Sequence, residues 1–196
     1  MFPTSNARAD DDGVAVVNSG PGSVTVNKNI LSQTRAVTSL LTPIMVRIIE
    51  VYNPSCDVSD LDIGMPGVEE KIKFNAVKAY AYNLIECCNY MSVIEMVIDT
   101  IDSEEPGSKE RFLWSIKKKY RDVKRQLMID HGFNPLEDDV MELINANADK
   151  IINLVSENIM SSATSTLSAP IELIEAAQEL IVCYGFINCQ ILEAPQ

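Results

Sequence analysis

A seven-residue apolar repeat between residues 77 and 101 most constrains what this chain can fold into. Apolar side chains recur there at alternating steps of three and four residues. The members of the repeat are Val77, Tyr80, Leu84, Cys87, Met91, Ile94, Ile98 and Ile101. Such spacing places one continuous apolar stripe along a helix, as in helical bundles and coiled coils. We therefore expect this segment to form a central helix.

The helix that contains this repeat should begin at Pro66, where the chain becomes rich in carboxylates. A preceding helix is predicted from the apolar stripe over residues 30–51. Pro43 should kink that helix, and Asn53, which precedes a proline, should end it. A turn-rich acidic connection over residues 53–66 separates these two predicted helices from each other, so they can pack side by side.

Three more helices are predicted downstream. The third starts after Ser108 as its cap and stops at His131, which precedes a glycine. Asn134, followed by proline and then Glu137, is a start signal for the fourth. The fifth should open at Pro170 and end near residue 185. The sequence therefore predicts an all-α fold, a bundle of about five helices.

Residues 1–28 differ from the rest of the chain. Two short β-prone runs, 14–17 and 24–26, flank a Gly/Pro-containing turn. We expect an N-terminal arm that is flexible or hairpin-like, either disordered or ordered by a partner, and a single α-helical domain over residues 29–196. Because an isolated hairpin is marginal in water, disorder and partner-induced order remain alternatives.

Half of the positive charge lies in one predicted helix. Of the 16 Lys and Arg residues, eight fall between positions 109 and 125, in a chain whose net charge is −12. At 100° per residue, one side of this helix is apolar and the opposite side is basic. The predicted core stripe is Leu113, Ile116, Tyr120, Val123 and Leu127. The predicted partner-binding residues are Arg111, Trp114, Lys117, Lys118, Arg121, Lys124 and Arg125.

Three interpretations of the basic helix remain open. It is a solvated face paired with the chain's own acids, a docking surface for another protein, or a contact for nucleic acid. The acidic charge of the remaining residues would repel a polyanion, so nucleic acid is disfavoured. Trp114, the only tryptophan, would be available to stack on a base.

No residue pattern indicates a catalytic, metal or cofactor site. The single histidine, His131, stands at a predicted helix end, where a positive charge is favoured. The five cysteines lack zinc-ligand spacing, and Cys87 and Cys88 are interpreted as buried thiols. Ser115 and Lys118 have a spacing found in some acyl-transfer enzymes, but their companion motifs are absent. We expect no enzyme activity and no cofactor.

The sequence thus predicts a non-enzymatic protein-interaction subunit: an acidic helical adaptor, chaperone or structural component of a larger assembly such as a secretion machinery. The alternatives are a nucleic-acid-associated subunit that uses residues 109–125 and a virion or phage component. We expect other protein subunits as partners, in a hetero-oligomer. No run is apolar enough to span a membrane, and the odd cysteine count and absent signal-peptide pattern favour the cytoplasm.

Overall fold

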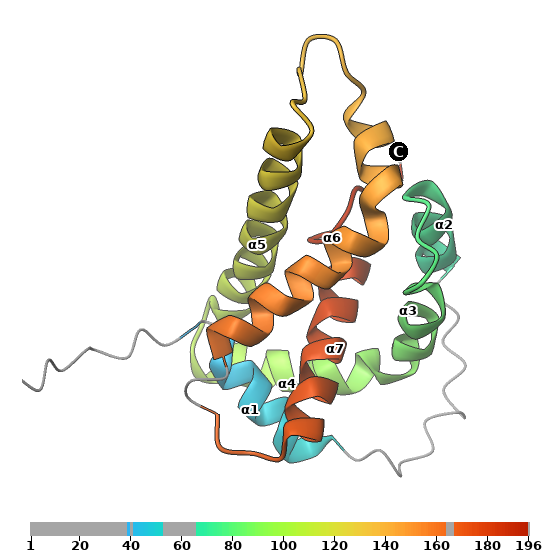
Figure 1. Cartoon of the computed structure of the whole chain (residues 1–196). Helices are drawn as coiled ribbons and strands as arrows, with labels where there is room; N and C mark the ends of the chain where they lie inside the picture. The colour runs from blue at the N-terminus through green and yellow to red at the C-terminus, as the bar shows by residue number, and fades with distance from the viewer. Residues whose placement is uncertain (1–38, 40, 53–65, 164–166, 196) are drawn as a thin grey trace, which may run out of the picture. The chain divides into compact units, whose positions relative to one another are not determined.

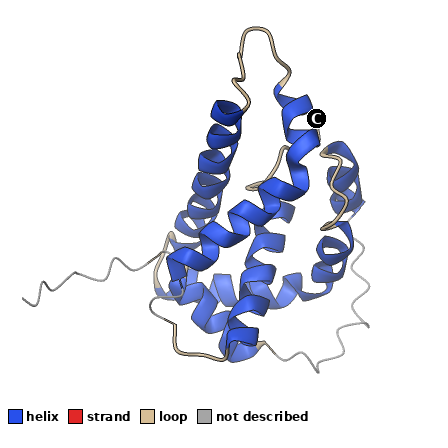
Figure 2. Cartoon of the chain, in the orientation of Figure 1, coloured by secondary structure: helices blue, strands red, loops and turns tan. Residues whose placement is uncertain are grey.

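The computed structural model describes residue 39 and residues 41–52, 66–163 and 167–195. Within these ranges every regular element is helical, so the predicted all-α fold is confirmed (Figure 2). The predicted arm over residues 1–28 lies outside the described residues. The elements are α1 (Thr42–Val51), α2 (Pro66–Phe74), α3 (Ala81–Cys87), the 3₁₀ turn η1 (Cys88–Tyr90), α4 (Met91–Glu104), α5 (Ser108–Asp130), α6 (Val140–Ala163) and α7 (Ile171–Ile187).

Helix α7 is the central element. It contacts α1, α3, α4, α5 and α6, and Figure 1 shows it running between them. Every residue from Leu180 to Phe186 is buried. A helix that is apolar on all sides can only be stable when other elements enclose it. The segment around residues 77–101 is therefore not the centre, as the sequence had suggested, but one of the layers around α7.

Helix α7 continues through Gly185, which the sequence predicted as its end. A Cβ atom on Gly185 would lie 2.7 Å from Cγ2 of Ile116 in α5. The glycine therefore permits close approach of α5 and α7 rather than terminating a helix. The helix therefore extends half a turn further than predicted, to Ile187.

The predicted helix over residues 66–101 is divided into α2, α3, η1 and α4. Helix α2 ends where Ala76 adopts a left-handed backbone with φ of 53°. In the following turn, the carboxylate of Asp149 in α6 accepts hydrogen bonds from the backbone N–H groups of Lys78 and Tyr80. A distant helix thus stabilises the interruption. The apolar repeat continues across it, which is why periodicity alone predicted one helix.

Two other helix starts differ from expectation. Pro43 lies in the first turn of α1, where a backbone N–H group has no partner within the helix, so the missing N–H of proline costs nothing there. Within the described residues Pro43 therefore stands at the start of a helix and does not kink one. Helix α6 begins at Val140 rather than near Asn134. Asp139 causes this delay, because its carboxylate accepts the N–H of Met141 and caps the start of α6. Residues 134–139 consequently form a separate turn.

Candidate functional site

Helix α5, which carries the basic stretch, begins and ends close to the predicted residues, but the prediction that Ser108 caps it is wrong. Gly107, with φ of 85°, precedes it, and the Ser108 side chain makes no capping hydrogen bond. At the other end His131 Nδ1 donates to the Leu127 carbonyl oxygen at 2.9 Å. His131 therefore has the helix-end location that the sequence predicted, and its imidazole is oriented by the backbone.

The inner face of α5 is apolar and packs into the core. Its buried members are Phe112, Ile116, Tyr120, Val123 and Leu127. Phe112 was absent from the predicted stripe, whereas Leu113 is only half-buried. The Phe112 ring packs on that of Tyr184, with centroids 5.9 Å apart. The helix is consequently fixed against α7 by large side chains.

The outer face of α5 carries most of the predicted partner-binding residues. The exposed members are Arg111, Trp114, Lys118, Arg121 and Arg125, while Lys117 and Lys124 are half-buried at the edges. The Trp114 side chain is 55 % exposed. These positions recur at steps of three and four residues, so they share one side of the helix. We call Arg111, Trp114, Lys118, Arg121 and Arg125 the α5 outer face.

Acidic residues of the same chain neutralise part of this face. Arg111 pairs with Glu105 at 2.7 Å, and Asp122 accepts from Lys118 at 2.7 Å. Asp122 also lies 3.5 Å from Arg125. Exposed pairs of this kind contribute only ~0–1 kcal/mol each, so they exchange readily with other partners.

Arg121 differs from its neighbours. Among the residues described by the structure, its guanidinium forms neither a hydrogen bond nor an ion pair with a side chain. Lys124, in contrast, points away from the outer face and contacts Glu193 of the C-terminal tail. The structure therefore groups Arg121 with Trp114 and separates Lys124 from them.

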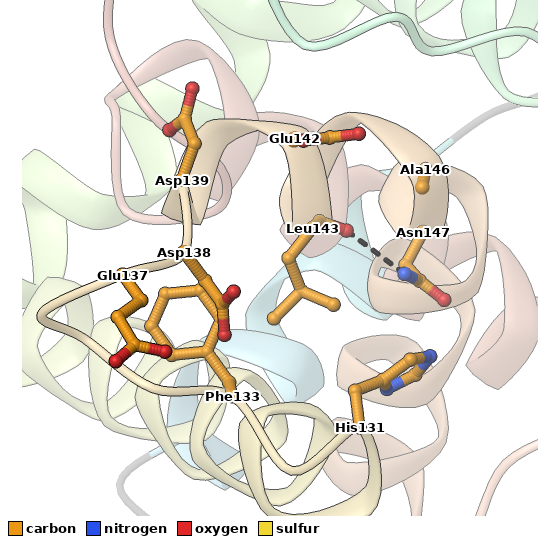
Figure 3. A pocket seen from close by; sticks show the side chains of 9 residues that line it. All are labelled: His131, Phe133, Glu137, Asp138, Asp139, Glu142, Leu143, Ala146 and Asn147. Carbon is orange, nitrogen blue, oxygen red and sulfur yellow. Dashed lines mark hydrogen bonds between the residues drawn. The ribbon is translucent and has the colours of Figure 1, made fainter.

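An acidic cleft of about 510 Å³ lies between the end of α5 and the start of α6. Figure 3 shows its lining, with the Phe133 ring beside Glu137 and Asp138 and the imidazole of His131 on the far side. Glu142 adds a further carboxylate to the lining. Sequence reasoning treated the histidine and the acidic turn separately. Because the chain reverses direction after residue 131, the structure brings them together.

The acidic turn beside this cleft has a defined conformation. The side-chain oxygen of Asn134 accepts the Leu136 N–H at 3.1 Å, and the Asp138 carboxylate accepts the Asn134 N–H at 2.6 Å. Leu136 is 92 % exposed. The Glu137 carboxylate makes no hydrogen bond or ion pair among the described residues. The turn over residues 134–139, called the Leu136 turn below, thus presents an apolar side chain next to an unpaired acid.

A second set of charges is enclosed beneath the C-terminal tail. Lys71 of α2 is only 2 % exposed. Its Nζ donates to the carbonyl oxygens of Phe186 and Ile191 and lies 4.5 Å from the centroid of the Phe186 ring. Burial lowers the pKa of Lys71 to about 8. This lysine joins α2 to the end of α7 and the residues that follow it.

Glu193 holds the same tail from the other side. Its carboxylate accepts hydrogen bonds from Tyr120 Oη at 2.8 Å and from Lys124 Nζ. The Asn75 side chain bonds both the N–H and the carbonyl of Glu193. Burial raises the pKa of Glu193, but the hydrogen bonds from Lys124 and Tyr120 to its carboxylate outweigh burial, so the pKa lies below its usual value. The polar atoms satisfy one another, which is the pattern of a structural network.

The cysteines and the serine–lysine pair offer no reactive constellation. Cys87, Cys88 and Cys183 are buried and free, as the sequence predicted for the first two. A hydrogen bond with Cys87 and burial raise the pKa of the Cys183 thiol, which favours the unreactive form. Ser115 and Lys118 line one pocket of about 300 Å³, but the Lys118 ammonium contacts Asp122.

The described residues contain no group of three or more His, Cys, Asp or Glu side chains placed to hold a metal ion. None of their helices combines the length and apolar character that a bilayer span requires. Comparison of the chain with family models, with curated proteins and with solved structures found no match. The functional interpretation therefore depends on the surfaces described above.

Proposed function

We propose that this chain is a non-enzymatic protein-interaction subunit that binds an acidic protein surface through the α5 outer face. The observation that carries the proposal is the location of Trp114, more than half exposed within a row of cations on a rigid helix. Tryptophan and arginine are the residues that most often dominate binding energy at protein interfaces. Such a surface would serve an adaptor, a chaperone or a structural component of a larger assembly equally well.

Charge distribution supports an acidic partner. The α5 outer face is a local region of positive charge on a chain whose net charge is −12. Such a face attracts an acidic protein surface, whereas the acidic remainder of the chain suppresses non-specific contact with polyanions. We also propose a cytoplasmic location, which is supported by the free thiols at residues 87, 88 and 183, since these fit a reducing compartment.

The quadruple reversal of Arg111, Lys118, Arg121 and Arg125 to Glu tests the proposal. We expect it to abolish co-purification of a partner from a lysate of the native host, with the helical circular dichroism unchanged. The matched control reverses four cations elsewhere, Arg47, Lys73, Lys78 and Lys150, and so changes the net charge equally. Loss of the partner in both variants, or in neither, would contradict a role for the α5 outer face.

Nucleic acid is the second candidate, because an exposed tryptophan beside arginines is also a stacking site for single strands. Trp114 is the only tryptophan, so its fluorescence reports on this face alone. Titration with oligothymidine at increasing salt distinguishes the candidates. Nucleic-acid binding should weaken steeply with salt, in proportion to the phosphates contacted, whereas a protein contact centred on Trp114 should weaken only modestly.

A further inference from the structure

Two surfaces of this chain complement each other but do not meet within one molecule. The α5 outer face combines the exposed Trp114 with Arg121, which has no partner among the described residues. The Leu136 turn combines an exposed leucine with the carboxylate of Glu137, which pairs with no residue in the described part of the chain. One surface is aromatic and basic, and the other is aliphatic and acidic. Both apolar side chains would lose water, and both charges would gain a partner, if the two surfaces joined.

The two surfaces cannot satisfy each other in the same copy. The Leu136 turn begins at residue 134, and Arg121 lies nine residues before the end of α5 at Asp130, a distance of roughly 14 Å along the helix axis. The conformation of the turn is fixed by its own hydrogen bonds to Asn134 and Asp138. Leu136 is also almost fully exposed, so it does not fold back on α5.

We infer that the Leu136 turn of one copy docks on the α5 outer face of a second copy, with Leu136 against Trp114 and Glu137 paired with Arg121. This inference rests on the proposed function, since it names the acidic surface that the face binds. The contact joins two different surfaces, so it is heterologous: a copy that offers its turn still has a free basic face.

The preorganised state of both sides favours the contact. Helix α5 is fixed in the core by Phe112 and Ile116, and the turn is fixed by two side-chain hydrogen bonds. Little conformational entropy is lost when rigid surfaces meet. Repulsion between two acidic copies is screened beyond ~10 Å at 0.1 M salt, so the local attraction between turn and face dominates at that ionic strength.

Sedimentation equilibrium of the full chain, at 0.1 M salt, tests this inference. The wild type should associate beyond its monomer mass of 21.7 kDa as its concentration rises. Arg121→Glu and Glu137→Arg should each weaken association by about tenfold or more, since each places like charges opposite one another. Circular dichroism should be unchanged, because both side chains are exposed.

Complementation distinguishes this contact from any other. The double variant R121E/E137R, which exchanges the two charges, should recover association. A mixture of the two single variants should also recover association, with the two variants in equal numbers, because the intact turn of the first fits the intact face of the second and their two reversed charges attract each other. The matched controls are Lys78→Glu and Glu69→Arg, which reverse one positive and one negative charge outside both surfaces. Each control alone, and an equal mixture of the two, should associate as the wild type does.

A wild type that stays monomeric, or one whose association none of these variants changes, overturns the inference. The proposed function survives either result if the quadruple reversal still removes a host partner and its control does not. The converse result is that the double variant R121E/E137R recovers association while the quadruple reversal still retains its host partner. That result would support self-association and contradict a role of the α5 outer face in binding other proteins.

Discussion

Helices α5 and α7 pack against each other, and both are long, yet they use their surfaces differently. Helix α7 has no solvent-facing side between Leu180 and Phe186, and the polar groups near its end serve to hold the following tail. Helix α5 has one such buried side and one side that is exposed and charged. Substitutions along α7 should therefore change stability, and substitutions on the α5 outer face should change binding alone.

The charges of the two regions sharpen the same contrast. Lys71 beneath the tail bonds two buried carbonyl oxygens. Lys118 on α5 bonds one exposed carboxylate. An enclosed donor cannot be replaced by water when it is removed, whereas an exposed one can. The same residue type thus has a structural role in one region and an exchangeable role in the other.

Lys71→Met should have the largest effect. It keeps the length of the side chain but leaves the Phe186 and Ile191 carbonyl oxygens without a donor, so we expect a loss of about 2–3 kcal/mol in the free energy of unfolding. Lys118→Met is the matched control and should cost less than ~1 kcal/mol. Urea denaturation followed by circular dichroism measures both. Equal effects would show that enclosure does not distinguish these lysines.

The wild type and Lys71→Met should also differ in how their stability depends on pH. The pKa of Lys71 is lowered to about 8 in the fold, so above that pH the unfolded chain binds more protons than the folded one. Stability of the wild type should therefore rise relative to Lys71→Met between pH 8 and 9.5, by up to ~1.4 kcal/mol per pH unit. The neutral amine still offers two N–H groups for the two carbonyls. A difference that stays constant across this range would argue against a lowered pKa.

Gly185→Ala should have an intermediate effect. The new Cβ would meet Ile116 Cγ2 at 2.7 Å, so α5 and α7 must separate or Ile116 must move, at a cost of about 1–3 kcal/mol. Gly67→Ala in α2 is the control, because nothing lies within 4 Å of that position. It should leave stability unchanged or slightly raised. If Gly185→Ala is also neutral in thermal melts, the close approach of the two helices is not a constraint.

Arg121→Ala should have the smallest effect on stability. This exposed guanidinium has no partner among the described residues, and such surface changes usually fall within ±0.5 kcal/mol. Thermal unfolding of this variant should therefore overlay that of the wild type. A clear loss of stability would assign Arg121 to the fold and remove the distinction between the two helices.

The sequence predicted α5 and its faces well because that helix is governed by local signals. Its apolar and basic residues alternate with the helical period, and a glycine follows His131 at its end. The exposure of Arg111, Lys118, Arg121 and Arg125 followed from the same spacing. Whether the α5 outer face binds a partner stays a prediction, because that depends on another molecule.

Other elements depend on contacts between distant residues, and the sequence pattern did not report them. The break at Ala76 is supported by Asp149, more than 70 positions away along the chain. A glycine at position 185 predicts the end of a helix, but in the structure a glycine is required there because Ile116 leaves no room for a Cβ atom. Lys71 shares a helical face with apolar residues, which was a signal of burial, yet its acceptors are backbone carbonyls that no side-chain pattern can reveal.

The central place of α7 has a consequence for how the protein is made. Ribosomes extend a chain from its N-terminus, so α1 to α6 emerge before the helix that fills the space between them. Synthesis advances by only ~5–20 residues per second, which leaves their apolar sides without a common partner for seconds. Nascent chains of this protein should therefore depend on holding factors, or on their own partial collapse, until α7 has been translated.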